Sequence, residues 1–223
     1  MRRAYGPHPD QHAVQRGDGA IPVVVLHGGF WRARYGSDLM EPFCDALAEQ
    51  GFATWNVEYR RVSAGGGYPE TLEDVAAACR DLMDGDAVAI GHSAGGHLAL
   101  WLAAEGLVRG AVALGAVCDL QAAARDRLGS GAALDLMGDA PEDAWAHADP
   151  AKRLPTGVPT VLVHGTRDET VPVSQARAYA AAARAAGDEC RIVELECGHF
   201  EPIEPPSPAW PHVVAALSSV ACR

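Results

Sequence analysis

A serine flanked by glycines is the feature of this sequence best suited to chemistry, because GHSAG at positions 91–95 places Ser93 two residues from each glycine. An apolar run precedes the motif at 87–90, and a small apolar helical pattern follows it at 93–104. A sharp turn from strand to helix holds such a serine in a strained conformation, with its hydroxyl clear of the sheet. The motif therefore predicts that Ser93 is a nucleophile. The alternative is an ordinary tight loop between strand and helix.

His199 is the histidine best placed to activate Ser93, among nine in the chain. A serine hydroxyl is a poor nucleophile, so it needs a base within hydrogen-bond reach and an acid that orients the base. His199 lies in a loop after the last strand pattern, at 191–195, and open parallel sheets gather functional side chains at the carboxyl ends of their strands. The sequence thus predicts His199 as the base, and the alternative is a structural loop histidine.

Asp168 is the carboxylate that the same rule selects, because it follows the strand pattern at 159–163. Glu169 beside it and Asp119, which follows an earlier strand pattern, are the competing acids. The chain order serine, aspartate, histidine is typical of this triad on a parallel α/β sheet. We therefore predict the triad Ser93, Asp168 and His199, with a turn or capping aspartate as the alternative reading of Asp168.

A glycine pair after the first strong strand pattern, 21–26, is the predicted oxyanion loop. Hydrolysis of an acyl group needs N–H donors aimed at the oxygen that becomes negative, and small residues let the backbone turn toward it. Gly29 and Phe30 are the predicted donors, with the N–H of Ala94 completing the oxyanion hole. The alternative is a glycine turn that merely leaves the strand.

Short apolar strand patterns alternate with helical patterns along most of the chain, which predicts an α/β fold with helices on both faces of a mostly parallel sheet. We expect six or seven strands in a single domain covering residues 1–223. The segment 118–157 breaks the alternation with two short helical patterns around a glycine-rich turn at 129–131, and it is predicted to be a small lid-like insertion. The strand patterns are 21–26, 52–57, 87–90, 110–114, 159–163 and 191–195, with a further candidate at 11–16; the helical patterns are 37–50, 70–83, 93–104, 175–186 and 208–220.

Composition narrows the range of partners. A formal net charge of −11 over 223 residues argues against nucleic acid, which needs clustered lysine and arginine. No apolar run is long enough to span a membrane, and the first residues lack the apolar stretch of a secretory signal. We therefore expect a cytoplasmic protein that acts on a small-molecule substrate, and the oligomeric state, a homodimer included, stays open.

The cysteines are scattered without CxxC spacing, which predicts reduced core thiols, with a disulfide framework as the weaker alternative. Neither cysteines nor histidines cluster at zinc-ligand spacing, and we expect no metal or organic cofactor. The six cysteines are Cys44, Cys79, Cys118, Cys190, Cys197 and Cys222.

The motifs together resemble the α/β-hydrolase superfamily across nearly the whole chain. They are HGGFW at 27–31, GHSAGG at 91–96, HGTRDETVP at 164–172 and GHF at 198–200. Within the superfamily, the branch of kynurenine formamidases and small carboxylesterases is most similar, and EYRR at 58–61 with GGYPETLED at 66–74 is similar to related acyl esterases. The resemblance implies the same triad and oxyanion donors. The chain departs from the formamidases in its short N-terminus, its small insertion, and Phe30 where they often have tyrosine.

The expected reaction is two-step acyl transfer through Ser93, with an aryl formamide or a small acyl ester as substrate. Trp31, Tyr68 and Trp145 are candidate substrate contacts, with core packing as the alternative for each. A short-chain carboxylesterase and an acetyl or feruloyl esterase are the alternatives of the same class. An acyltransferase or peptidase of this fold, or a non-catalytic binding protein that keeps the fold, is the alternative from another class.

Overall fold

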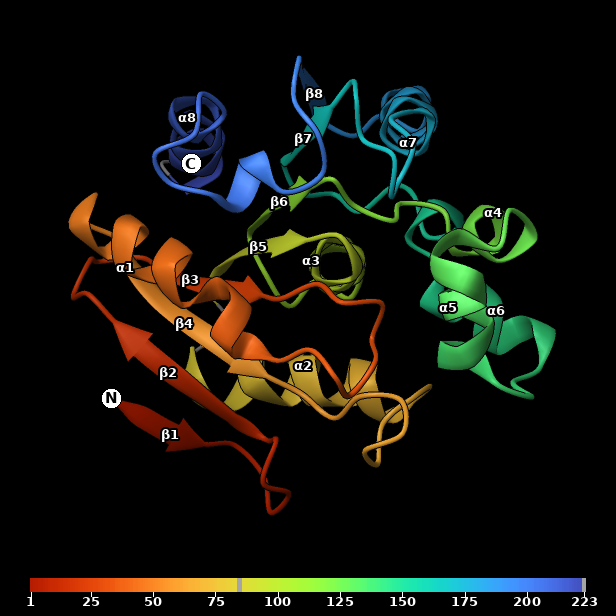
Figure 1. The fold of residues 1–223 in the computed structure, drawn as a ribbon, viewed down its shortest axis with the longest axis horizontal. Coiled ribbons are helices and arrows are strands. Elements are labelled where there is room, and N and C mark those ends of the chain that lie inside the picture. The colour runs from red at the N-terminus through yellow and green to blue at the C-terminus, as the bar shows by residue number, and fades with distance from the viewer. Residues whose placement is uncertain (84–85, 222–223) are drawn as a thin grey trace.

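The computed structural model describes residues 1–83 and 86–221, and within them eight strands form one sheet in the order β1-β2-β4-β3-β5-β6-β7-β8 (Figure 1). β1 and β2 pair antiparallel at one edge, and all strands from β4 to β8 in that order run parallel. The predicted fold class is confirmed, with one strand more than expected. The strands are β1 (Arg2–Ala4), β2 (His12–Arg16), β3 (Pro22–Leu26), β4 (Ala53–Glu58), β5 (Val88–His92), β6 (Gly110–Leu114), β7 (Thr160–Gly165) and β8 (Cys190–Leu195).

Strands β3 and β6 are apolar along their whole length because both faces of the sheet are covered. In β3, Val23 and Val25 pack into the core on one face, and Val24 and Leu26 pack into the core on the other. All four side chains are fully buried. The alternation of the pleat thus places successive residues in two separate cores, and both favour apolar side chains. β4 differs, because it also buries polar side chains that form hydrogen bonds, Glu58 among them.

Helices cover both faces: α1 and α8 pack on one side of the sheet, and α2, α3 and α7 pack on the other (Figure 1). The predicted helix at 37–50 is divided into a 3-10 turn and α1, which begins just before Pro42. The helices are α1 (Glu41–Glu49), α2 (Glu70–Leu82), α3 (Ala94–Ala104), α4 (Leu120–Arg125), α5 (Leu128–Met137), α6 (Glu142–Ala148), α7 (Ser174–Ala185) and α8 (Trp210–Ala221); the 3-10 helices are η1 (Ser37–Met40), η2 (Pro150–Lys152) and η3 (Glu201–Ile203).

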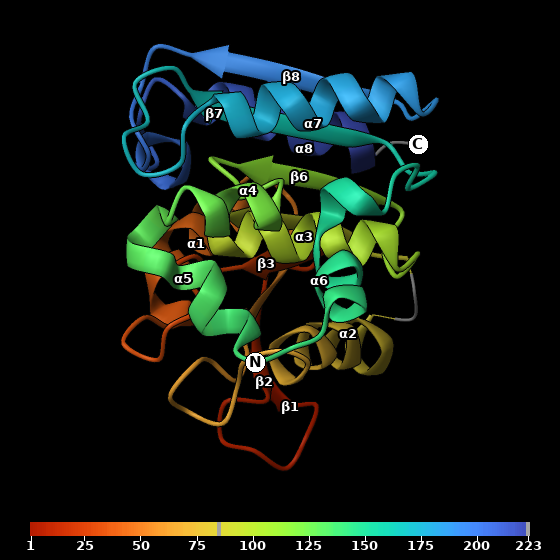
Figure 2. The same ribbon diagram turned by 90° about the vertical axis from the view of Figure 1, so that its right-hand side faces the viewer.

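The insertion between β6 and β7 consists of α4, α5, α6 and η2, and it lies on the face of the sheet that carries α3 (Figure 2). Gly129, Ser130 and Gly131 adopt left-handed backbone angles inside α5, so the predicted turn there is present and a helix continues from it to Met137. The ring of Phe30 packs directly against Gly129, where a Cβ atom would collide with it. The insertion therefore contacts the loop that follows β3.

Five of the six cysteines are free and buried, as predicted for reduced core thiols: Cys44, Cys79, Cys118, Cys190 and Cys197. Cys222 lies outside the described residues. Burial raises the pKa of the Cys44 and Cys79 thiols to about 12, which keeps them protonated and unreactive. Among the described residues, no helix is both long enough and apolar enough to cross a membrane.

Candidate active site

Ser93 lies on a strained turn between β5 and α3, with backbone angles φ 56° and ψ −116°. Its N–H donates to the carbonyl of Leu114 in the neighbouring strand at 2.8 Å, which fixes the turn to the sheet. The two glycines of the motif are required sterically: a Cβ on Gly91 would collide with the backbone of Gly95, and a Cβ on Gly95 would collide with the carbonyl of Leu26. The local structure is that of a nucleophile elbow.

Asp168 and His199, which are 31 residues apart, meet at the carboxyl ends of β7 and β8. His199 Nδ1 lies 2.6 Å from Asp168 Oδ2, and the other carboxylate oxygen accepts the N–H groups of Thr170 at 2.9 Å and Val171 at 2.8 Å. Burial would raise the pKa of Asp168, but hydrogen bonds from His164, His199 and the Val171 N–H together lower it well below the ordinary value. Asp168 is therefore an ionised carboxylate that orients the imidazole of His199.

The competing acids take other positions. Asp119 caps α4, where its Oδ1 accepts the N–H of Ala122 at 2.6 Å. Glu169 is exposed to solvent. Neither residue forms a hydrogen bond with His199 within the described part of the chain.

Ser93 and His199 line one cavity of about 450 Å³ at this end of the sheet. Because Asp168 engages Nδ1 of the imidazole, Nε2 is the nitrogen left to act on the serine hydroxyl. Both residues are nearly buried, with 4% of Ser93 and 8% of His199 exposed, so charge that develops between them is poorly screened by water.

His92 positions the loop of His199 through a contact that the motif spacing does not reveal. Its Nε2 donates to the backbone carbonyl of His199 at 2.9 Å, and the two rings lie 4.5 Å apart. Burial, together with the neighbouring His199, lowers the pKa of His92 to about 3. A neutral His92 keeps one ring N–H for this bond. Sequence reasoning assigned it no role, because side chains adjacent in an elbow diverge.

His164, at the end of β7, contacts both Asp168 and the backbone of the loop that follows it. Its Nε2 lies 2.8 Å from the carbonyl of Val171 and 3.4 Å from Asp168 Oδ2. One ring N–H is therefore shared between the loop backbone and the carboxylate. His164 opens the HGTRDETVP motif at 164–172, and that motif was the available signal for this residue.

The loop after β3 has three successive residues with positive φ: Gly29 (106°), Phe30 (60°) and Trp31 (56°). This backbone turns N–H groups away from the sheet, and Gly29 and Phe30 line the same cavity as Ser93. Among the hydrogen bonds of residues 1–83 and 86–221, none uses the N–H of Gly29, Phe30 or Ala94 as a donor. Three N–H groups are thus available to a substrate oxygen.

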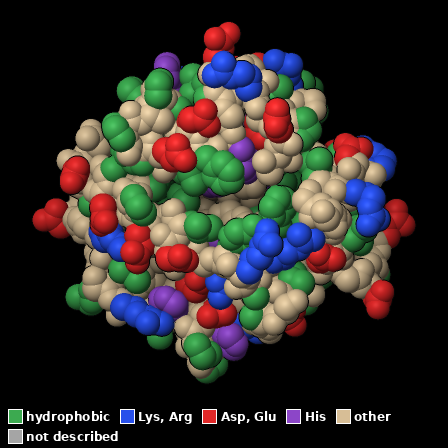
Figure 3. Space-filling view, viewed as in Figure 1, with side chains coloured by type: hydrophobic (Ala, Val, Ile, Leu, Met, Phe, Trp, Pro, Cys, Tyr) green, Lys and Arg blue, Asp and Glu red, His purple; other side chains and the backbone are tan. Residues whose placement is uncertain are grey.

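The remaining cavity walls are mainly apolar and come from two segments far apart in the sequence, 35–42 around η1 and 200–205 around η3. Figure 3 shows a hollow near the centre of this face, bordered by hydrophobic side chains. Leu39 and Phe200 remain 46% and 56% exposed, which identifies them as residues at its mouth. The apolar wall residues are Phe30, Tyr35, Leu39, Met40, Pro42, Phe200, Ile203 and Pro205.

The structure does not bring the three candidate substrate contacts to this cavity, as far as its described lining residues show. The left-handed backbone of Trp31 turns the indole into the core, where it is 2% exposed and meets the ring of His97 edge-on at 5.2 Å. Tyr68 contacts His147, with its hydroxyl 3.2 Å from Nδ1. Trp145, in α6, is partly buried and packs against the core. The predicted lid 118–157 likewise supplies none of the described cavity walls.

Two buried histidines should make the free energy of unfolding depend on pH. Burial lowers the pKa of His97 to about 4, as it lowers that of His92 to about 3. The unfolded chain takes up protons near pH 6.5, whereas the folded chain does not until the pH reaches these lower values, so stability is lost as the pH falls below about 6.5. We expect each histidine to reduce the free energy of unfolding by about 2 kcal/mol between pH 7.5 and pH 5.

Urea denaturation at the two pH values measures this loss. His97→Gln should reduce the pH dependence, whereas the exposed control His212→Gln should leave it unchanged. An equal pH dependence in His97→Gln and the wild type would contradict the assignment.

A family model, BD-FAE, matches residues 11–182 of the chain. Among solved structures, esterase 2 from Thermogutta terrifontis with propionate bound has a TM-score of 0.79 at 21% identity, covering 98% of this chain and 92% of that chain. The same esterase phosphoramylated by tabun has a TM-score of 0.80 at the same identity and coverage. A bifunctional GH43-CE protein from Bacteroides eggerthii has a TM-score of 0.81 at 18% identity, covering 99% of this chain and 35% of that chain. The comparison with curated proteins gives no significant match.

Proposed function

The chain belongs to the BD-FAE family and is a hydrolase of the esterase type, and on this premise we propose that it cleaves small carboxylic esters through Ser93, His199 and Asp168. The observation that carries the proposal is the cavity in which the strained Ser93 and the Asp168-oriented His199 meet. A serine on a strained turn and a carboxylate-oriented histidine that line one cavity support acyl transfer to the serine.

The proposed reaction begins when His199 Nε2 takes the proton of Ser93 as the hydroxyl oxygen attacks the ester carbonyl. The carbonyl oxygen becomes negative, and the N–H groups of Gly29, Phe30 and Ala94 donate to it. His199 then passes its proton to the leaving alcohol, and the acyl group stays on Ser93. Asp168 stabilises the imidazolium form of His199 throughout.

The second half of the reaction releases the acid. A water molecule gives a proton to His199 as it attacks the acyl-enzyme, and the proton returns to Ser93 when the acid leaves. The groups that stabilise the first tetrahedral intermediate serve the second one as well, since the charge develops on the same oxygen.

The cavity supports a short apolar acyl group. Its walls are largely aliphatic and aromatic, and Glu204 is the one carboxylate among the described residues that line it. A negatively charged acyl group would be repelled there. The related Thermogutta esterase holds propionate, which agrees with an acid of this size.

The proposed cavity predicts a preference for esters with short acyl chains. We expect p-nitrophenyl acetate, propionate and butyrate to be hydrolysed with higher kcat/KM than p-nitrophenyl decanoate, because acyl chain and leaving group share one cavity of about 450 Å³ and the longest chain has to compete with the leaving group for it. Steady-state kinetics on this ester series measures the preference. A rising kcat/KM toward decanoate would contradict the short acyl pocket.

An aryl formamide remains the second candidate substrate, favoured by the HGG-aromatic-Trp loop at 27–31. A formyl group needs even less space than acetyl. Turnover of N-formylkynurenine, measured beside the esters, decides between them: formamide turnover well above that of every ester would replace the esterase proposal.

A further inference from the structure

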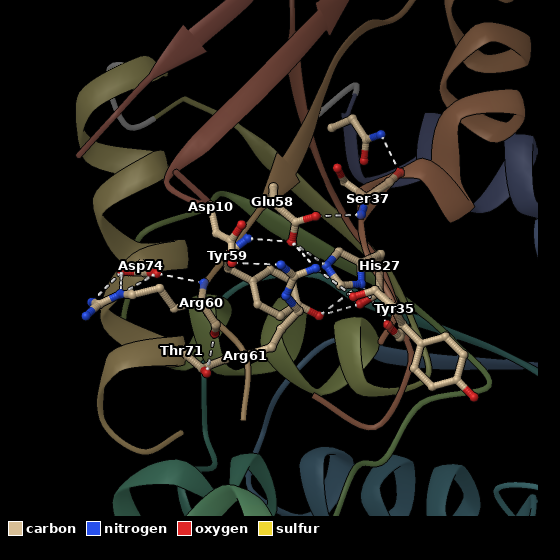
Figure 4. Close-up of polar contacts among 12 residues, drawn as sticks. Asp10, His27, Tyr35, Ser37, Glu58, Tyr59, Arg60, Arg61, Thr71 and Asp74 are labelled. Carbon is tan, nitrogen blue, oxygen red and sulfur yellow. Dashed lines mark hydrogen bonds and ion pairs between the residues drawn. The ribbon is translucent and has the colours of Figure 1, made fainter. Parts of the chain in front are cut away.

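His27 is fully buried at the end of β3, directly behind the glycines of the predicted oxyanion loop. Its Nδ1 lies 2.7 Å from the carbonyl oxygen of Gly28, and its Nε2 lies 3.0 Å from Oε1 of Glu58 (Figure 4). A carbonyl oxygen and an ionised carboxylate can only accept hydrogen bonds. Both ring nitrogens therefore have to donate, which requires the doubly protonated, positively charged form of the imidazole.

Glu58, at the end of β4, is held in its ionised form. Its two oxygens accept the N–H of Ser37 at 2.8 Å and the N–H of Tyr59 at 3.0 Å, and Arg61 Nη1 lies 3.1 Å from Oε1. Burial would raise the pKa of Glu58, but the hydrogen bond and charge of His27, the N–H of Ser37 and the charge of Arg61 lower it overall. The N–H groups of Ser37 and Tyr59 and the guanidinium of Arg61 stabilise the ionised carboxylate independently of His27. An ionised Glu58 cannot donate a proton to Nε2 of His27.

The charges around His27 balance. Glu58 and Asp10 are the acidic partners, and Arg61 bridges them, since its Nη2 lies 2.8 Å from Asp10. Two carboxylates, of which Asp10 is partly exposed, thus face one guanidinium, and a cationic His27 makes the group neutral. The ring of Tyr59 stacks on His27 at 4.3 Å with an interplanar angle of 5°, a geometry that favours a cation over a π face.

His92, from the end of β5, lies against Gly28. Its lowered pKa keeps His92 neutral, so it adds no repelling charge. The hydroxyl of Tyr59 lies 3.4 Å from Nδ1, but its one proton is donated to the backbone carbonyl of His27 at the shorter distance of 2.7 Å. Tyr59 carries no charge either, because burial raises its pKa far above the ordinary value.

We propose that His27 is a buried imidazolium held by Glu58, and that it polarises the Gly28–Gly29 peptide so that the N–H of Gly29 becomes a stronger donor to the oxyanion. The carbonyl that accepts from His27 and the N–H of Gly29 belong to one peptide unit, and hydrogen bonds in such a chain strengthen one another. The catalytic part of this proposal rests on the proposed function. His27 and Glu58 are positioning residues, since they act through the backbone of the loop.

Glu58 also connects the loop to the cavity wall. Through the N–H of Ser37 it fixes the start of η1, which carries the wall residues Leu39 and Met40. The same carboxylate thus fixes the position of the oxyanion loop, through His27, and of one wall of the substrate cavity, through Ser37.

Nitrogen-15 NMR of the full-length protein labelled at histidine tests the charge without reference to catalysis. We expect one histidine, assigned to His27 by its loss in His27→Gln, to show both ring nitrogens protonated at pH 7.5, and this state to disappear in Glu58→Gln. A neutral His27 at pH 7.5 in the wild type would overturn the proposal, whatever the activity.

Steady-state kinetics on p-nitrophenyl acetate tests whether the N–H of Gly29 is strengthened as an oxyanion donor. Glu58→Gln should lower kcat by about 10- to 100-fold with KM changed less than about threefold, because the strengthened donor acts on the transition state. Glu194→Gln, which removes an exposed carboxylate paired with Arg177, should leave both constants unchanged. An unchanged kcat in a folded Glu58→Gln would overturn this inference while leaving the proposed function intact; that function fails separately if Ser93→Ala keeps its turnover.

Discussion

Replacing Ser93 with alanine is expected to lower kcat for p-nitrophenyl acetate by about four orders of magnitude or more, because the acyl group then has no oxygen to which it can transfer. The Cβ atom stays in place on the strained turn, so the fold and the cavity should be preserved. Steady-state hydrolysis with a parallel thermal melt measures both properties.

The matched control is Ser218→Ala, which removes a hydroxyl that donates to the carbonyl of Val214 one turn earlier in α8. It should keep the wild-type kcat. Turnover of Ser93→Ala within tenfold of the wild type would mean that another nucleophile, or water activated directly, carries the reaction.

Replacing Asp168 with asparagine is expected to lower kcat by about 10⁴-fold, the second large effect. The amide can still accept the N–H groups of Thr170 and Val171, so the loop should remain folded. It cannot stabilise the charged imidazolium of His199, and its NH₂ group favours the wrong tautomer. Kinetics at pH 7.5, compared with the wild type, measures the loss.

Glu169→Gln tests the neighbouring carboxylate under the same conditions. Because Glu169 is exposed, we expect kcat to change less than about twofold. A large loss in Glu169→Gln together with a small one in Asp168→Asn would reverse the assignment of the acid.

The fold follows from the sequence wherever burial imposes a pattern. A strand such as β3 is apolar because two cores need its side chains, as Val23, Val24 and Val25 show. β1 (Arg2–Ala4) was not predicted: its three residues are exposed and polar or small, so pairing with β2 is a backbone interaction without an apolar signal. The antiparallel edge of the sheet therefore could not be predicted from hydrophobic periodicity.

Some residues of the candidate site could likewise be predicted from the sequence, and others could not. Ser93, Asp168 and His199 could be selected because strand ends and chain order restrict where such residues can lie. The cavity walls could not, since Leu39 and Phe200 come from distant segments and meet only through packing of η1 and η3 beside the sheet. The insertion at 118–157 instead packs beside α3, so proximity of an insertion in sequence did not indicate which side of the serine the substrate cavity occupies.

The hydrogen bonds from histidine side chains to backbone carbonyls could not be predicted from the sequence either. His92 acts on a carbonyl of the His199 loop, and His27 acts on the carbonyl of Gly28. Neither partner is a side chain, so no residue type or spacing marks the interaction. Trp31 shows the converse, since its aromatic character suggested a substrate contact but its left-handed backbone turns the ring into the core.

Labelling with a fluorophosphonate tests the central claim most directly, because the reagent reacts with an activated serine irrespective of the natural substrate. Intact-protein mass spectrometry should show one adduct on the wild type, and peptide mapping should place it on Ser93. His199→Ala should label far more slowly, and Ser93→Ala should not label. An unlabelled wild type, or an adduct on another serine such as Ser63, would contradict the assignment of Ser93 as the nucleophile.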